Sequence, residues 1–184
     1  MNALERLSIF IPAFRKNSRF QGDLLRKLDG VSLVQRAIDK ARLLGCSDES
    51  IHLFTDSEDI ALVAKRNNVG VVCSPMLSLE GAVVDDNFRE HLTIAEKDSD
   101  ISVLLSPYAP LLTVEAVQQA TNVFLKSKAQ VLQPVRIEKR RLFDGKEATL
   151  INSLLGDRDE IHRIESRAFT LFQSGQLLQS GDKL

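Results

Sequence analysis

Short apolar runs alternate with amphipathic segments along most of this chain. Each run is bounded by Pro, Gly or polar residues, which is typical of buried strands. The predicted strands are residues 7–12, 50–55, 70–74, 101–105 and 129–135. Between them, apolar residues recur at helical spacing, so that each segment has one apolar face. The predicted helices are residues 32–44, 56–67, 84–97 and 113–125.

This alternation predicts an α/β domain with a mostly parallel central sheet. Right-handed crossovers between parallel strands place helices on both faces of the sheet. Strands covered on both faces bury their side chains. The residues expected in the core are Ile9, Ile11, Leu53, Val71, Val103 and Leu105. Such sheets bind ligands beyond the carboxyl ends of their strands. The loops in that position follow Pro12, Thr55, Ser74 and Leu105.

Local signals set several boundaries. Ser32 followed by Gln35 fits a capping box, in which each side chain caps the backbone of the other residue. Asp56 is a candidate N-cap for the second helix, and Thr113 for the fourth. Beyond residue 135 the alternation ends. Residues 136–141 (RIEKRR) are expected to be a solvated charged turn, residues 168–172 a strand and residues 174–178 a short helix.

Composition and charge narrow the class of protein. The chain has 184 residues, 43% hydrophobic and 27% charged, which suits a single domain over 1–184 and excludes a disordered chain. Its formal net charge of -1 argues against nucleic-acid binding, which needs a basic field. No apolar run has the length of a membrane span or a signal peptide, so we expect a cytoplasmic protein without membrane contact. Cys46 and Cys73 form no zinc motif, and Cys73 is expected to be a small core residue.

The loop after the first predicted strand carries the candidate chemistry. It contains Arg15, Lys16 and Arg19 together with the small residues Ser18 and Gly22. Guanidinium groups bind oxyanions in a bidentate way, and small residues let backbone N–H groups approach a phosphate. The alternative is a solvated basic loop without a ligand, since unpaired charge costs little in water. No Walker motif and no GxGxxG is present, which argues against a P-loop or dinucleotide site.

Three blocks of sequence carry a family resemblance. The first, IPAFRKNSRFQGDLLRKLDGVSLVQRAI, begins at Ile11, the second, TDSEDIALVAKRNNVGVV, at Thr55, and the third, VLLSPYAPLLTVEAV, at Val103. In this order they resemble the acylneuraminate and KDO cytidylyltransferases, enzymes that make CMP-activated sugar acids. The residues shared with the opening motif of that family are Ile11, Pro12, Ala13, Ser18, Arg19 and Gly22.

The resemblance implies a Rossmann-like nucleotidyltransferase fold and transfer of CMP from CTP to a sugar acid such as sialic acid or KDO, with release of pyrophosphate. It also implies Mg²⁺ as the cofactor and a homodimer. The residues that it places at the nucleotide are Pro12, Ala13, Arg15, Lys16, Ser18, Arg19, Gly22 and Asp56, with Arg15 and Arg19 in the catalytic role. It places Ser106 and Tyr108 on the sugar side.

The sequence departs from the family pattern where the chemistry lies. Phe14 stands in place of an Arg, Lys16 of a Gly, Asp23 of a Lys and Leu112 of an Arg. An anion in place of a cation beside a triphosphate costs roughly 6 kcal/mol before screening, at an effective dielectric constant of about 20. No metal carboxylate of the family is matched, and the unmatched candidates are Asp85, Asp86, Asp157, Asp159 and Asp182.

These departures leave two hypotheses open. One is a divergent cytidylyltransferase in which Arg15, Lys16 and Arg19 hold the triphosphate. The other is a catalytically inactive relative that keeps the scaffold for binding or assembly. Both are compatible with the same fold, because a fold does not fix a function.

Overall fold

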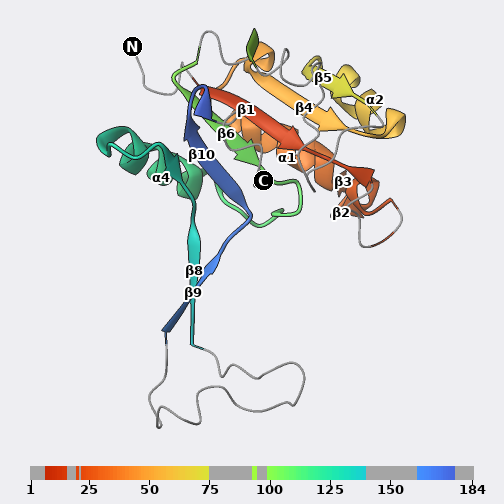
Figure 1. Cartoon of the computed structure of the whole chain (residues 1–184). Coiled ribbons are helices and arrows are strands. Elements are labelled where there is room, and N and C mark those ends of the chain that lie inside the picture. Colours follow the sequence, from red (N-terminus) through yellow and green to blue (C-terminus); the bar gives the residue numbers. More distant parts are fainter. Residues whose placement is uncertain are drawn as a thin grey trace.

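A six-stranded sheet crosses the centre of the described structure (Figure 1). The computed structural model describes residues 7–15, 20, 22–74, 93–94, 99–139 and 161–176. The order across the sheet is β5 (Gly70–Cys73), β4 (Ile51–Thr55), β1 (Leu7–Pro12), β6 (Ile101–Leu105), β10 (Phe169–Gln173) and β7 (Val131–Leu132). β1 pairs in parallel with β4 and β6, and β4 with β5, whereas β10 runs antiparallel to β6 and β7. The predicted α/β fold with a mostly parallel sheet is confirmed.

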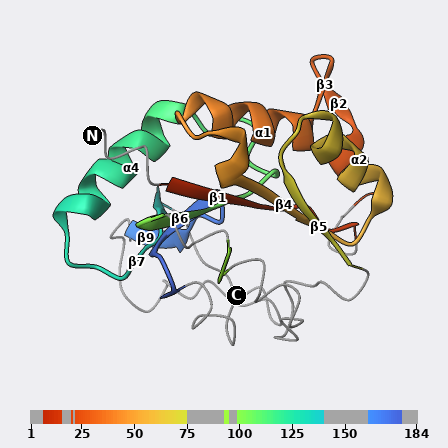
Figure 2. The same cartoon turned by 90° about the horizontal axis from the view of Figure 1, so that it is seen from above.

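The α-helices whose bounds are described lie along one face of this sheet (Figure 2). They are α1 (Leu33–Leu43), α2 (Glu58–Arg66) and α4 (Val114–Lys126). Their apolar faces join β1, β4 and β6 in one core cluster. Of the predicted helix 84–97, only residues 93–94 are described, and they are helical. Of the predicted helix 174–178, residues 174–176 are described: residues 174 and 175 form a turn and residue 176 is helical. No described helix is both long and apolar enough to cross a membrane.

The central strands are apolar on both faces. Of the residues expected in the core, Ile9, Ile11, Leu53, Val103 and Leu105 are fully buried. Val71 is only partly buried, because it lies on the edge strand β5. Phe10 alternates with Ile9 and Ile11 and therefore points to the other face. There it stacks on His52 and Phe54, with ring centroids 5.5 and 5.6 Å away.

Helix capping follows the sequence signals in part. Ser32 Oγ accepts a hydrogen bond from the N–H of Gln35 at 3.2 Å, and Thr113 caps α4 in the same way, so both predicted N-caps are confirmed. The Gln35 side chain does not complete a capping box. It exchanges two hydrogen bonds with the side chain of Asn67, at the end of α2.

A polar cluster fixes α1 to its neighbours. Arg42 donates to both carboxylate oxygens of Asp48 in η4 (Asp48–Ser50), at 2.8 and 3.1 Å. The same guanidinium donates to the carbonyl of Asn67 at 2.6 Å. The hydrogen bonds from Arg42 hold the pKa of the Asp48 carboxyl below its ordinary value. A bidentate guanidinium pair thus joins α1, η4 and the end of α2.

A small hairpin precedes α1. It consists of β2 (Lys27–Leu28) and β3 (Val31–Ser32), which pair antiparallel. Its turn residues Asp29 and Gly30 have φ angles of 53° and 80°. Both belong to the left-handed region, which Gly adopts without strain and Asp tolerates better than most residues.

A two-stranded arm projects away from the main sheet (Figure 1). It consists of β8 (Val135–Lys139) and β9 (Ile161–Glu165), paired antiparallel. The expectation of a solvated turn over residues 136–141 is therefore wrong for residues 136–139, which pair with β9. Apolar and charged residues alternate along β8, as they do in a strand, and Val135 and Ile137 are 49% and 65% exposed.

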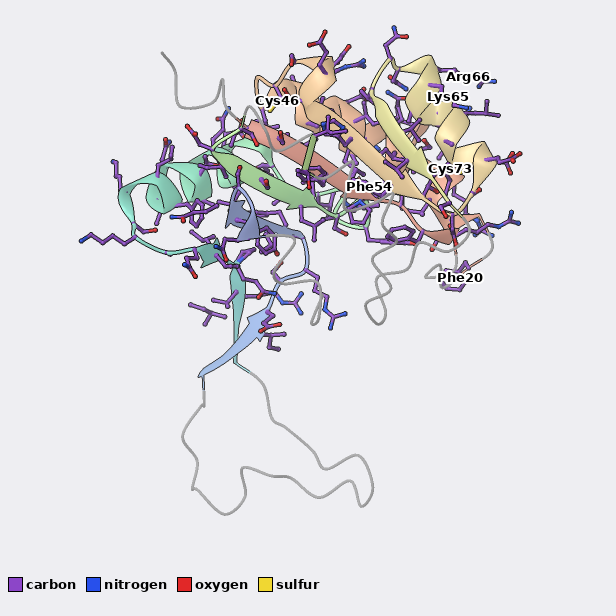
Figure 3. The ribbon with its side chains drawn as sticks, turned by 45° about the horizontal axis from the view of Figure 1, so that its top comes forward. Phe20, Cys46, Phe54, Lys65, Arg66 and Cys73 are labelled. Atoms are coloured by element: carbon purple, nitrogen blue, oxygen red, sulfur yellow. The ribbon has the colours of Figure 1, made fainter. Side chains whose placement is uncertain are left out.

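The two cysteines lie at different depths (Figure 3). Cys46 is partly buried, and burial raises the pKa of its thiol to about 11, which disfavours the reactive thiolate at neutral pH. Cys73 is exposed at the last position of β5. The expectation that Cys73 is a small core residue is wrong, because β5 is an edge strand and only part of its length is covered.

Candidate functional site

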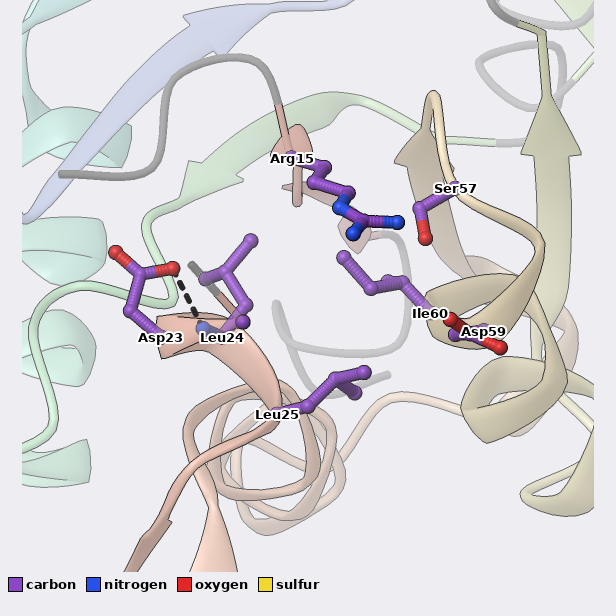
Figure 4. A pocket seen from close by; sticks show the side chains of 8 residues that line it. Arg15, Asp23, Leu24, Leu25, Ser57, Asp59 and Ile60 are labelled. Carbon is purple, nitrogen blue, oxygen red and sulfur yellow. Dashed lines mark hydrogen bonds between the residues drawn. The ribbon is translucent and has the colours of Figure 1, made fainter. Parts of the chain in front are cut away.

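The carboxyl ends of β1, β4 and β6 meet at one edge of the sheet. β4 and β6 flank β1 on opposite sides, which is the strand arrangement at which open α/β sheets bind their ligands. A pocket lies here between the loop after β1 and the start of α2 (Figure 4). Its lining combines the polar residues Arg15, Asp23, Ser57 and Asp59 with Gly22, Leu24, Leu25 and Ile60.

Two hydrogen bonds tie the loop after β1 to the end of β4. The N–H of Ala13 donates to the Phe54 carbonyl at 2.8 Å, and the N–H of Arg15 donates to Asp56 Oδ1 at 2.5 Å. The prediction that Asp56 is the N-cap of α2 is wrong, because Ser57 takes that position. The Arg15 side chain reaches toward Ser57 across the pocket, as Figure 4 shows. A guanidinium therefore lines a pocket at the edge of the sheet where open α/β sheets bind their ligands.

Gly22 and Asp23 contribute the other wall of the pocket. Gly22 has a φ of +68°, and a Cβ there would meet nothing within 4 Å, so conformation rather than crowding favours glycine. Asp23 begins η3 (Asp23–Leu25). Its Oδ1 accepts hydrogen bonds from the N–H of Leu24 at 2.6 Å and from the hydroxyl of Tyr108 at 3.2 Å. The carboxylate is thus held by donors of the protein itself.

Ser106 and Tyr108 lie on the loop after β6. The N–H of Ser106 donates to the carbonyl of Ala168 at 3.0 Å, which joins this loop to the segment before β10. Ser106 Oγ accepts from the N–H of Tyr108 at 3.2 Å. The Tyr108 side chain is 43% exposed and extends to Asp23. One hydrogen bond therefore links the loop after β6 to the wall after β1.

The predicted nucleotide residues fall into three groups. Arg15 and Gly22 line the pocket, and Asp56 supports Arg15. Pro12 and Ala13 are buried at the end of β1, so that only their backbone can serve a ligand. The remaining predicted residues, Lys16, Ser18 and Arg19, lie outside the described residues.

Sequence reasoning missed two polar residues of the pocket, Ser57 and Asp59. Both stand in the block that begins at Thr55, and their place after a strand was the available signal. It also missed Lys40, which holds the loop after β6 from α1. A lysine on a helix gives no sequence signal for such a contact, since its partner is a backbone carbonyl far along the chain.

Three departures from the family pattern are built into the packing of the chain. Phe14, in place of an Arg, is 3% exposed. Leu112, in place of another Arg, packs against the hydrophobic core. Asp23, in place of a Lys, is bonded to Tyr108 and to the backbone of Leu24. These positions serve the fold and present no cation to a ligand.

The described residues do not fit a magnesium ion held by the protein. Mg²⁺ prefers carboxylate oxygens in near-octahedral geometry. Asp23 is bonded to its neighbours, and Asp56 serves the backbone of Arg15. Within the described ranges, no group of three or more His, Cys, Asp or Glu residues could hold a metal ion. The candidates of the sequence analysis, Asp85, Asp86, Asp157, Asp159 and Asp182, all lie outside those ranges.

Comparison with known proteins points to one class of enzyme. No family profile matches the sequence. A 3-deoxy-manno-octulosonate cytidylyltransferase of Francisella philomiragia is 27% identical over 127 residues, which cover 68% of this chain and 49% of that protein. The Francisella tularensis protein of the same name is 28% identical over 130 residues, covering 70% of this chain and 50% of that protein.

Solved structures agree on the fold. CMP:2-keto-3-deoxy-manno-octonic acid synthetase complexed with CTP superposes with a TM-score of 0.69 at 13% identity, covering 96% of this chain and 77% of that one. 4-Diphosphocytidyl-2C-methyl-D-erythritol synthase from Anaerococcus prevotii gives a TM-score of 0.60 at 12% identity, covering 98% and 76%. The findings are consistent with a divergent member of the KDO cytidylyltransferase family. The chain spans about half the length of the curated relatives it matches.

Proposed function

We propose that the protein is a divergent cytidylyltransferase that transfers CMP from CTP to a sugar acid of the sialic acid or KDO kind. The observation that carries this proposal is the pocket at the carboxyl end of β1, which Arg15 and Gly22 line and where Asp56 accepts a hydrogen bond from the backbone of Arg15. In such a transfer, an oxygen of the sugar acid attacks the α-phosphorus of CTP. The P–O bond to the β-phosphate breaks, and pyrophosphate leaves.

Alignment and charge neutralisation carry most of the catalysis in phosphoryl-type transfers. In this proposal Arg15 and Arg19 hold the phosphates, together with Lys16, Ser18 and the backbone at Pro12, Ala13 and Gly22. Asp56 keeps the first loop in place through the N–H of Arg15. Ser106 and Tyr108 face the sugar acid from the loop after β6. We include a homodimer and a cytoplasmic location in the proposal, with no nucleic acid or membrane as partner.

The family resemblance, and not the described residues, is the reason to include magnesium in this proposal. A divalent ion bound with CTP would lower the negative charge of the phosphates. Since no described group of carboxylates suits it, we assign it no ligand and no step. Titrating the protein with CTP in the presence and absence of Mg²⁺ measures whether the ion matters for binding.

The test combines binding with turnover. Calorimetric titration with CTP is expected to give saturable binding, and Arg15→Ala and Arg19→Ala each to weaken it by about 1.5–3 kcal/mol, the range for hydrogen bonds to charged groups. Arg66→Ala is the matched control, because Arg66 is exposed at the far end of α2 (Figure 3). Pyrophosphate release is then followed with CTP and 3-deoxy-manno-octulosonate. Failure of wild type to bind CTP would sink the proposal.

A second candidate function is a catalytically inactive nucleotidyltransferase-fold protein that binds or assembles. The burial of Phe14 and the packing of Leu112 favour it, because both stand where the family has cations. Thermal shifts with CTP, CMP and other nucleotides distinguish the candidates. A ligand at 100 times its dissociation constant adds about 2.7 kcal/mol of stability, which is easily seen. Binding without pyrophosphate release supports the inactive form.

A further inference from the structure

Lys40 lies on α1, outside the pocket, and reaches the loop after β6. Its ammonium group donates to the carbonyl of Ala109 at 2.8 Å and lies 3.5 Å from that of Pro110. The side chain is half-buried, and burial, with a smaller contribution from the charge of Arg36, lowers its pKa. A cation between two carbonyl dipoles is a directed contact that a solvated lysine does not make.

The loop that Lys40 holds is organised by short-range hydrogen bonds. The N–H of Ala109 donates to the carbonyl of Ser106 at 3.3 Å, and the N–H of Leu112 to the carbonyl of Ala109 at 3.2 Å. The carbonyl of Ala109 therefore accepts from both Leu112 and Lys40. Ala109 belongs to two successive turns, 106–109 and 109–112. A contact that holds its carbonyl therefore holds the centre of the loop.

Tyr108 is next to this anchored position. Its hydroxyl donates to Asp23 Oδ1 at 3.2 Å, which links the loop after β6 to a residue that lines the pocket. The hydroxyl of a tyrosine reaches its partner only if the backbone that carries the side chain is correctly placed. Lys40 and Asp23 thus act on the same loop from two elements that precede it in the chain.

We propose that Lys40 is a positioning residue, which places Tyr108 against Asp23 by holding the Ala109 and Pro110 carbonyls. The connection to sugar-acid binding rests on the proposed function, whereas the connection between Lys40 and Tyr108 does not. Groups that orient others within a site improve binding and turnover without touching the reacting atoms. The proposal therefore makes separate statements about loop structure and about substrate.

The chain offers a specific probe of the loop. Tyr108 is the single tyrosine, and there is no tryptophan, so intrinsic tyrosine emission comes from this side chain alone. A carboxylate that accepts the hydrogen bond of a phenol quenches its emission. In Lys40→Met we expect the emission to rise toward that of Asp23→Asn and its anisotropy to fall. We expect Lys40→Arg, which keeps a cationic donor, to restore most of the wild-type signal.

Amide hydrogen exchange gives an independent measure. Loss of a charged hydrogen bond is expected to accelerate exchange at the amides of Ala109, Leu111 and Leu112 by roughly ten- to hundred-fold in Lys40→Met. Lys65→Met is the matched control, because Lys65 is exposed on α2 (Figure 3), and it should change neither signal. If Lys40→Met does not fold, Lys40→Ala removes the same donor with less side chain to bury. Wild-type emission and exchange in a folded Lys40→Met or Lys40→Ala variant would overturn the proposal.

Turnover separates this inference from the proposed function. With CTP and 3-deoxy-manno-octulosonate, Lys40→Met should raise the KM for the sugar acid about ten-fold, the effect of roughly 1.4 kcal/mol of lost positioning, and Lys40→Arg should recover it. An inactive wild type contradicts the proposed function but leaves the emission and exchange results valid. An active wild type whose sugar-acid KM is unchanged in Lys40→Met contradicts the substrate part of the inference.

Discussion

The body of the sheet differs from its rim, the loops that follow β1 and β6, in what the side chains contact. In the body, buried residues of β1, β4 and β6 meet the apolar faces of α1, α2 and α4, and Ile9, Ile11 and Leu53 are fully covered. At the rim, Phe14 and Leu112 point inward and Asp23 is bonded to Tyr108. The side chains of the body pack against one another, whereas three positions of the rim at which the resembled family has cations carry groups that contact the chain itself.

This difference shows what packing constrains. A core position must exclude water and fill space, so few residue types fit it. A rim position is constrained mainly by the ligand, so it changes when the ligand or the activity changes. Likeness to solved structures therefore establishes the fold, and the rim decides whether the pocket takes a triphosphate.

The largest expected effect is the loss of stability when a buried side chain of the body is truncated. Ile9→Ala removes a fully buried side chain from β1 and should lower the free energy of unfolding by about 2–5 kcal/mol. Leu43→Ala is the control, because Leu43 is 69% exposed on α1 and should cost less than about 0.5 kcal/mol. Urea denaturation measures both. Similar losses for the two variants would contradict the contrast between covered and uncovered positions.

Close packing within the sheet gives the next effect. A Cβ at Gly70 would lie 2.7 Å from His52 Nδ1 and 3.2 Å from the carbonyl oxygen of Ile51. Gly70→Ala should therefore cost about 1–3 kcal/mol through overpacking. His52→Ala makes room, so the double variant should be more stable than the sum of the two single changes allows. Additive losses would mean that the crowding comes from the backbone rather than from the His52 ring.

At the rim, the charge of Asp23 decides whether its replacement strengthens or weakens CTP binding. Asp23→Lys should strengthen CTP binding about ten-fold at low salt, roughly 1.4 kcal/mol, if this carboxylate repels a triphosphate. The gain should shrink as salt is raised, because screening acts over about 8–10 Å. Titration calorimetry at two salt concentrations checks both statements.

Two variants make that result interpretable. Asp23→Asn removes the charge without adding a cation. Glu49→Lys makes the same change of charge in η4, at the end of the sheet where β4 begins, and should leave CTP binding unaltered. Weaker binding in Asp23→Lys would show that the carboxylate serves the ligand, and that the rim has been rebuilt for a different working site.

The smallest effect concerns the polar cluster in which Arg42 of α1 donates to Asp48. The pKa of Asp48 is lowered by the hydrogen bond from Arg42, so its ionised form stabilises the folded state above the ordinary carboxyl pKa. Wild type should therefore be more stable than Asp48→Asn at pH 7. The difference should vanish as the pH falls through the lowered pKa, where both side chains are neutral. Thermal melts across this range test it, and a difference that persists in acid would refute the role of charge.

Sequence patterns predict the strands and helices of the body well, because their signals are local. The predicted bounds of β1 and β6 match, and α1, α2 and α4 begin within about two residues of the predicted starts, which is the ordinary uncertainty of helix ends. Apolar periodicity and the caps at Ser32 and Thr113 were sufficient. The β2–β3 hairpin was missed although Asp29-Gly30 is a recognised turn signal.

The remaining features depend on partners distant in sequence. The charges along β8 predict a solvated turn, because its partner strand β9 lies beyond residue 160 and gives no local signal. The strand near residue 170 was predicted, but its antiparallel place between β6 and β7 was not. In the candidate site, the residue types after β1 were visible in the sequence. The bonds of Asp56 to Arg15, Tyr108 to Asp23 and Lys40 to Ala109 each span a long stretch of chain and could not be predicted.

The place of β10 also has a consequence for how the protein is made. β6 ends at Leu105, and its outer neighbour β10 begins only at Phe169. During synthesis, β5, β4, β1 and β6 can pair while the partner of β6 is still being added. A growing chain then carries an open strand edge, which is the kind of surface that associates with other nascent chains. β7 is synthesised before β10 and also pairs with it. A late segment of the chain therefore completes a sheet whose first strand is β1.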